Sequence, residues 1–223
     1  MTQVSTLAKA PQTSKGQRTR QKLVEAAEHE FAELGYERAS VAGIVARAEV
    51  AQGTFYVYFP DKKSIFVELV DSLSVRLRRF LTAAVAGAPD RLAVERAGLR
   101  AFLDFCEQHR GLYRIVPQAE FVDEACYRRY YRRLADGYVR GLKSAMDKGE
   151  LRKLDPEIAA HCLMGLTDMI GQNFVLWRPG VARERLIDQV MDLIANGLAP
   201  RPGEPARLPL KAASKKPLKR ARK

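Results

Sequence analysis

The chain has 223 residues, of which 47% are hydrophobic and 29% are charged. This length can bury the core of one large domain or of two small ones that share a contiguous core. Polar side chains interrupt the most apolar stretch, 160–177, so we expect no membrane span. No apolar block followed by a cleavage site opens the chain, which predicts a cytoplasmic protein.

The net charge of +12 lies at the two ends of the chain. The first twenty residues hold four basic and no acidic side chains, whereas 201–223 holds nine basic side chains against Glu204. Basic ends on a neutral body favour a polyanionic partner, because Lys and Arg near phosphates release condensed counterions. A solubilising tail is the alternative interpretation.

Side chains that carry chemistry are few and widely spaced. The cysteines are odd in number and form no CxxC pair, which disfavours a disulfide framework or a zinc site. No nucleophile elbow, phosphate-binding glycine loop or paired-histidine motif is present, so we expect no enzyme, no metal and no cofactor. The residues concerned are Cys106, Cys126, Cys162, His29, His109 and His161.

Apolar spacing predicts helices almost throughout and no strand, so the expected fold class is all-α. Gly35 is a plausible end for the first helix, whereas Ser40 and Asp61 are suited to cap the second and the fourth. Pro60 stands where a helix stops, and Pro156 where one starts. The expected helices cover, in chain order, 15–34, 41–48, 52–58, 61–86, 92–109, 124–148, 156–177 and 181–198, with a short segment at 111–117.

The most informative stretch is 40–63, because a short capped helix, a turn of about four residues and a second short helix give the spacing of a helix-turn-helix. Apolar side chains would pack the two helices together and leave the polar ones facing outward. The expected packing residues are Val41, Ile44, Val45, Val50 and Phe55.

The second short helix of this pair carries side chains suited to DNA. Gly53 lets the backbone approach closely, where free amides favour phosphate. Gln52 and Thr54 can reach base edges from the first turn, whereas Tyr56 and Lys62 suit phosphate oxygens.

The segment 31–35, followed by VAQGTFYVYFPDKKSIF at 50–66, resembles the DNA-binding domain of the tetracycline-repressor (TetR) family of bacterial regulators. Gly-Thr, the aromatic run, Phe-Pro and the following Lys stand in the family's order. By position, the resemblance implies DNA contacts at Ser40, Gln52, Gly53, Thr54, Tyr56 and Lys62. Tyr58 is a further candidate contact with an aromatic core position as the alternative, and Phe59 is expected in the core.

Two departures from the family pattern leave the operator sequence open. Ala51 stands where the family often has Ser or Thr, so the recognition helix lacks a usual cap and phosphate ligand. Val57 stands where an aromatic residue or His is common.

The resemblance implies an N-terminal three-helix helix-turn-helix DNA-binding domain followed by a helical-bundle domain for ligand binding and dimerisation. Such a protein binds a palindromic double-stranded DNA operator as a homodimer, and a small-molecule effector releases it. The expected boundaries are 1–14 for a flexible basic arm, 15–60 and 61–198 for the two domains, and 199–223 for a disordered basic tail.

The last two helices offer apolar faces that could form a four-helix bundle across a twofold axis, with burial inside one chain as the alternative. The residues concerned are Cys162, Gly165, Leu166, Met169, Ile170, Asn173 and Phe174 with Ile187, Val190, Met191 and Ile194.

Aromatic and soft side chains of the C-terminal part could converge on a pocket for a largely apolar or aromatic ligand such as a fatty acid or an acyl-CoA. For each of them an ordinary core position is the alternative. The candidates are Phe105, Tyr113, Phe121, Tyr127, Tyr131, His161, Met164 and Asp168. An arginine cluster could attract the anionic end of the ligand or form a solvated face. It comprises Arg128, Arg129, Arg132 and Arg133.

Two other functions remain open on sequence alone. A helical protein-interaction module without ligand control could use the long fourth helix and the basic tail for protein contacts. The run KKPLKRARK at the end of the chain could be a nuclear localisation signal, although such clusters are weak signals.

Overall fold

The computed structural model describes residues 13–178 and 180–197, and for Leu112 only the backbone. Within these ranges the protein consists of helices joined by short turns and has no strand, which confirms the predicted all-α class. The basic tail at 199–223 and nearly all of the predicted N-terminal arm lie outside the described residues. No helix within the described ranges is both long and apolar enough to cross a membrane.

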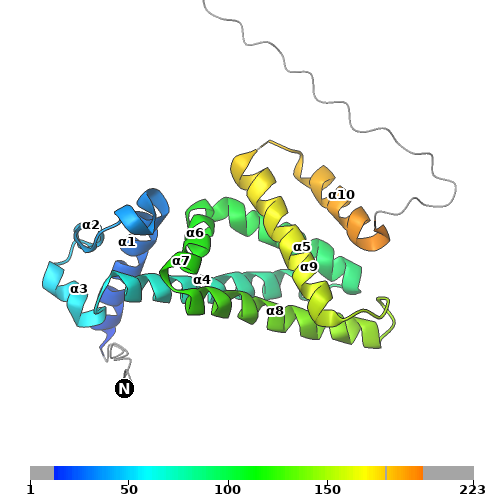
Figure 1. Cartoon of the computed structure of the whole chain (residues 1–223), viewed down its shortest axis with the longest axis horizontal. Coiled ribbons are helices and arrows are strands. Elements are labelled where there is room, and N and C mark those ends of the chain that lie inside the picture. Colours follow the sequence, from blue (N-terminus) through cyan, green and yellow to red (C-terminus); the bar gives the residue numbers. More distant parts are fainter. Residues whose placement is uncertain (1–12, 179, 198–223) are drawn as a thin grey trace, which may run out of the picture.

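Three helices and the start of a fourth form the N-terminal unit (Figure 1). They are α1 (Ser14–Arg38), α2 (Val41–Ala48), α3 (Gln52–Tyr58) and α4 (Lys62–Ala84). The predicted end of the first helix is a break inside α1, since Gly35 adopts φ 76° and ψ 166°, a conformation that glycine reaches without strain. The caps at Ser40 and Asp61 are confirmed: Ser40 Oγ accepts from the Gly43 N–H at 2.9 Å and Asp61 Oδ1 from the Ser64 N–H at 2.7 Å.

Phenylalanine side chains form the centre of the N-terminal core. The rings of Phe31 on α1 and Phe66 on α4 meet edge to face with centroids 5.1 Å apart. Phe55 is the buried residue of α3, and all three side chains are 0% exposed. Burial of each ring contributes roughly 2–3 kcal/mol, so this cluster determines which face of α3 points inward.

The second half of the chain supplies α5 (Arg91–Gln108), α6 (Arg110–Ile115), η1 (Val116–Gln118) and α7 (Ala119–Val122). They are followed by α8 (Glu124–Asp147), α9 (Pro156–Gly171), the π-helical turn η2 (Gln172–Trp177) and α10 (Arg183–Asn196). Figure 1 shows α4 running from the N-terminal unit along α8, so that α4 belongs to both halves of the molecule.

The expected single helix 156–177 is wrong beyond Gly171, where the α-helix gives way to η2. A side chain at Gly171 would place its Cβ 3.0 Å from Phe102 and 3.4 Å from Cys106 Sγ, so the backbone passes very close to α5 there. Helix α7 was not expected either. Four-residue helices are too short to show a periodic pattern.

The two halves touch directly at α1 and α6 as well as through α4. A Cβ added at Gly111 would lie 2.6 Å from the Cβ of Ala32, so α6 and α1 pack backbone against backbone. Ion pairs also join α4 to α1 and to the start of α8. Arg76 on α4 reaches Glu28 on α1 at 3.0 Å, and Lys63 reaches Asp123 at the start of α8 at 2.9 Å.

Candidate DNA-binding surface and ligand pocket

The turn between α2 and α3 orients the second helix of the pair. Glu49 ends α2 in the left-handed region, with φ 55° and ψ 45°. The N–H of Val50 then donates to the carbonyl of Val45 at 3.1 Å, which closes the turn. Because Phe55 anchors α3 from beneath, the opposite face of α3 is left to solvent.

Most of the predicted DNA contacts lie on this outer face. Gln52, Gly53 and Tyr56 are exposed, with 52% of the Tyr56 surface accessible, whereas Thr54 and Tyr58 are half-buried. An added Cβ at Gly53 would meet no atom within 4 Å, so the protein itself does not require glycine there.

The ends of α2 and α3 leave polar groups available. No side chain caps α3 at Ala51, which leaves its first amides free for a phosphate. Ser40 is exposed at the start of α2, and its hydroxyl can still donate while its oxygen caps the helix. Val57 is 71% exposed and presents methyl groups beside Tyr56.

The structure gives the Lys62 ammonium group partners within the protein. Its Nζ donates to the carbonyls of Tyr36 at 2.7 Å and Ala39 at 2.9 Å, and lies 4.3 Å from the centre of the Tyr36 ring. An ammonium group has only three donors, so these contacts largely occupy it. Lys62 therefore ties the end of α1 to the start of α4.

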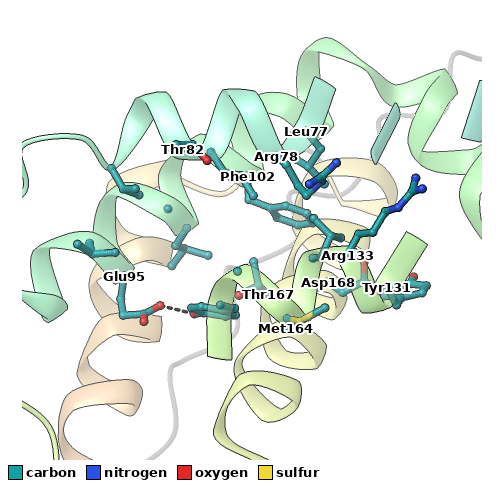
Figure 2. A pocket seen from close by; sticks show the side chains of 18 of the residues that line it. Leu77, Arg78, Thr82, Glu95, Phe102, Tyr131, Arg133, Met164, Thr167 and Asp168 are labelled. Carbon is teal, nitrogen blue, oxygen red and sulfur yellow. Dashed lines mark hydrogen bonds between the residues drawn. The ribbon is translucent and has the colours of Figure 1, made fainter. Parts of the chain in front are cut away.

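A cavity of about 390 Å³ lies between α4, α5, α8, α9 and α10 (Figure 2). This volume is within the range of small-molecule sites, roughly 300–1,000 Å³. Its wall is mostly aliphatic and aromatic, with polar groups at a few places. The apolar lining includes Leu77, Leu81, Val85, Val94, Leu99, Phe102, Leu134, Met164 and Ile194.

Four of the predicted ligand residues line this cavity, namely Tyr113, Tyr131, Met164 and Asp168. The Tyr113 hydroxyl donates to a carboxylate oxygen of Asp168, and Gln172 Nε2 donates to the other at 3.1 Å. Burial, together with this carboxylate, raises the pKa of Tyr113 far above its ordinary value, so the phenol stays a donor.

The other four predicted ligand residues lie elsewhere. Phe105 is 6% exposed and belongs to the core, where its ring centroid is 4.4 Å from that of His109. Phe121 on the short helix α7 points to solvent and is 89% exposed. Tyr127 and His161 line a separate shallow groove between α8 and α9. Helical spacing alone did not distinguish these faces.

Sequence reasoning missed a buried polar group in the cavity wall. Arg91 and Glu95, one turn apart on α5, are 8% and 7% exposed, and Arg91 Nε donates to Glu95 Oε1 at 2.7 Å. The Tyr138 hydroxyl donates to the other oxygen of Glu95 (Figure 2). Gly141 makes room, since a Cβ there would lie 2.5 Å from Arg91 Nη1. The i,i+4 spacing of opposite charges was the only available signal.

The predicted arginine cluster is largely committed to intramolecular ion pairs. Arg129 and Arg133 both reach Asp71 on α4, at 2.9 and 2.8 Å, and thereby fasten α8 to α4. Arg128 pairs with Glu124 at 2.6 Å on its own helix. Part of the cluster therefore holds α8 against α4. The sequence had suggested either a site for the anionic end of a ligand or a solvated face, and neither includes this role.

The two faces expected at a dimer interface have different environments. Ile187 and Val190 of α10 are buried against α5 of the same chain. The prediction that these α10 residues face a partner is therefore wrong, and the alternative, burial inside one chain, holds for them.

On α9 and η2, the predicted interface residues Leu166, Ile170 and Phe174 also pack against this core. Ile158 and Met169, by contrast, are 66% and 53% exposed, and Gly165 between them faces open space. An exposed apolar stripe thus follows the outer side of α9.

A helix-turn-helix with an exposed recognition helix defines the class of this protein as a DNA-binding protein. Residues 23–69 match the profile of the bacterial regulatory proteins of the tetR family. The chain is 28% identical over 200 residues to the HTH-type transcriptional regulator YdgC of Bacillus subtilis, covering 84% of this chain and 96% of that protein.

Solved structures share the whole fold. The fatty acid degradation regulator FadR of Bacillus halodurans superposes with a TM-score of 0.74 at 23% identity, covering 86% of this chain and all of that one. FadR of Bacillus subtilis, solved in complex with stearoyl-CoA, gives a TM-score of 0.71 at 20% identity over 80% and 99% of the two chains. Residues 23–69 thus match the DNA-binding domain of the tetR family, and the chain over most of its length is similar to transcriptional regulators.

Proposed function

We propose that this protein is a repressor that binds palindromic operator DNA as a homodimer and is released by a small, largely apolar ligand. The observation that carries the proposal is the position of α4. Its first half packs Ile65, Phe66 and Leu69 into the DNA-binding core, and its second half presents Leu77 and Leu81 to the cavity. Occupation of the cavity therefore acts on an element that positions the recognition helix.

DNA recognition is assigned to the outer face of α3. Gln52 and Thr54 stand in the first turn, from which side chains of a recognition helix reach base edges in the major groove. Tyr56, Ser40 and the open backbone at Gly53 are suited to phosphate oxygens. Tyr58, half-buried beside the core, is an additional candidate contact.

Dimerisation is assigned to the outer stripe of α9. A twofold axis next to Ile158, Gly165 and Met169 would cover these surfaces with the same surfaces of a second copy. Two recognition helices can then occupy successive major grooves about 34 Å apart. A ligand that favours a different separation of the two helices prevents simultaneous binding of both half-sites.

The ligand class follows from the apolar wall and from the structural neighbours. The similarity to a regulator solved with stearoyl-CoA supports a fatty acid or its acyl-CoA as the effector. The relatives are transcriptional regulators, and an enzymatic activity has no support from their descriptions.

The test is titration of the purified protein against its own upstream DNA, measured by fluorescence anisotropy. Gln52→Ala should weaken binding by about 1–3 kcal/mol and relax the preference at one base position. Gln189→Ala, at an exposed site on α10, is the matched control and should bind like the wild type. Equal binding by wild type and Gln52→Ala to both operator and scrambled DNA would contradict the proposal.

A further inference from the structure

One side of the cavity is formed by α4 and α8, and arginines gather there. Arg78 on α4 and Arg133 on α8 lie on the same side of the cavity in Figure 2. Arg140 follows Arg133 at the i+7 position, on the same face of α8, and Gly137 between them carries no side chain. The guanidinium of Arg140 lies over this gap, with Nη2 3.9 Å from where a Gly137 Cβ would be.

Ion pairs within the protein do not neutralise this side of the cavity. The single carboxylate of Asp71 is shared by Arg129 and Arg133. Arg78 donates only Nε, to the carbonyl of Ser74 at 3.2 Å, and forms no ion pair with any residue the structure describes. Arg140 likewise has no acidic partner within the described ranges.

The acids in the cavity wall are already engaged. Glu95 is held by Arg91 and Tyr138, and Asp168 accepts from Tyr113 and Gln172. Neither carboxylate pairs with the arginines on the α4–α8 side. A cavity with an apolar interior and two free guanidinium groups at one side suits a molecule with an apolar chain and an anionic end.

The shallow groove between α8 and α9 extends this basic surface. It shares Tyr131 and Arg140 with the cavity, and its walls also hold Arg132 and His161. Arg132 is exposed and forms no ion pair with the described residues. A headgroup larger than a carboxylate can therefore extend from Arg140 toward Arg132, where a phosphate would find a second cation.

We propose that the α4–α8 side of the cavity, called the seam below, binds the anionic headgroup of an amphiphilic effector. Arg78 and Arg140 are the residues that bind this headgroup. The inference rests on the proposed function in taking this cavity as the effector site. It adds that one end of the effector is anionic, that this end lies at the α4–α8 side of the cavity, and which residues bind it.

The experiment measures binding of three compounds with a twelve-carbon chain to the full-length protein by isothermal titration calorimetry. The two anionic probes are kept below their critical micelle concentrations and the alcohol below its solubility limit. A methylene group takes about the room of a water molecule, roughly 30 Å³. A cavity of about 390 Å³ therefore suits a chain of about twelve carbons. The probes are neutral dodecanol, dodecanoate and dodecanoyl-CoA, which share the chain and differ in the headgroup.

Both anionic probes should bind the wild type at least about tenfold more tightly than dodecanol. Arg78→Gln and Arg140→Gln should each remove about tenfold of that preference and leave dodecanol binding unchanged. Arg79→Gln is the matched control, because Arg79 is an exposed neighbour on α4 that does not line the cavity. Thermal melts establish that each variant is folded.

Arg132→Gln distinguishes the two sources of the anion. Weaker binding of dodecanoyl-CoA alone indicates a phosphate-bearing headgroup that extends into the groove, whereas unchanged binding of both anionic probes indicates a carboxylate held at the seam. Dodecanol binding as tight as the anionic probes, or anion binding insensitive to Arg78→Gln and Arg140→Gln, would overturn the inference.

Operator affinity, measured separately, tests the proposed function. If anionic probes bind with the expected arginine dependence but never change operator affinity, the proposed ligand control fails and the headgroup site stands. If dodecanol releases the operator as well as the anionic probes do, the proposed function stands and the headgroup site fails.

Discussion

Gln118 Oε1 accepts a 2.7 Å hydrogen bond from the backbone N–H of Tyr36, which joins the segment η1 to the end of α1. Gln118 directly follows Val116 and Pro117, both of which line the cavity. Tyr36 in turn supplies a carbonyl and its ring to Lys62. The cavity wall is therefore two contacts away from the start of α4.

Gln118→Leu should remove this connection while keeping a side chain of similar length. The orphaned, half-buried N–H of Tyr36 should cost about 1–3 kcal/mol of unfolding free energy, and the effect of a bound ligand on operator affinity should decrease. Urea denaturation and operator titrations with and without dodecanoyl-CoA measure the two effects. Gln118→Glu retains an acceptor oxygen for the Tyr36 N–H but loses the donor to the Arg114 carbonyl, so it should recover only part of the stability.

Gly53→Ala should separate DNA binding from folding. The new methyl group meets no atom of the protein within 4 Å, and alanine is favoured over glycine in a helix by about 0.5–1 kcal/mol. The variant should therefore be at least as stable as the wild type, yet bind operator about tenfold more weakly because Cβ separates the backbone from the phosphate. Unchanged operator affinity would show that DNA does not approach α3 at this residue.

Lys62→Met should act on stability, although the sequence pattern suggested a phosphate contact. Loss of the donors to the Tyr36 and Ala39 carbonyls should cost about 1–3 kcal/mol in urea unfolding. Lys63→Met is the control, since its ion pair with Asp123 is half exposed and should contribute no more than about 1 kcal/mol. A stable Lys62→Met protein with a reduced salt dependence of DNA binding would restore the phosphate assignment.

Asp123 should make stability depend on pH in the acid range. Burial opposes the charge of this carboxylate, but hydrogen bonds from Lys63 and from the Cys126 N–H outweigh it and lower its pKa below 3.8. A depressed pKa contributes stability above the unfolded value that is lost as pH falls through the folded value. The stability advantage of wild type over Asp123→Asn should therefore be constant near pH 6 and decrease progressively as the pH falls below about 4. An advantage that persists in full at pH 3 would contradict this.

The sequence by itself determined the local structure of this protein. Ser40 and Asp61 have side chains whose oxygens can reach only the amides of the next turn, so the caps they predict depend on no distant contact. The spacing of two short helices around a turn at 40–63 predicted the helix-turn-helix, again from neighbouring residues alone. Periodicity also predicted α4 as one long helix.

Only the tertiary structure decided which face of each helix is buried and against what. Phe105 and Phe121 look alike in sequence, yet one is enclosed by the core and the other is exposed on α7. Lys62 belongs to the motif, yet its ammonium group donates to three carbonyls at the end of α1. The buried pair Arg91 and Glu95 became part of the cavity because Gly141, on a distant helix, leaves space for the guanidinium. These outcomes depend on contacts between residues far apart in the chain, which local propensity and spacing do not contain.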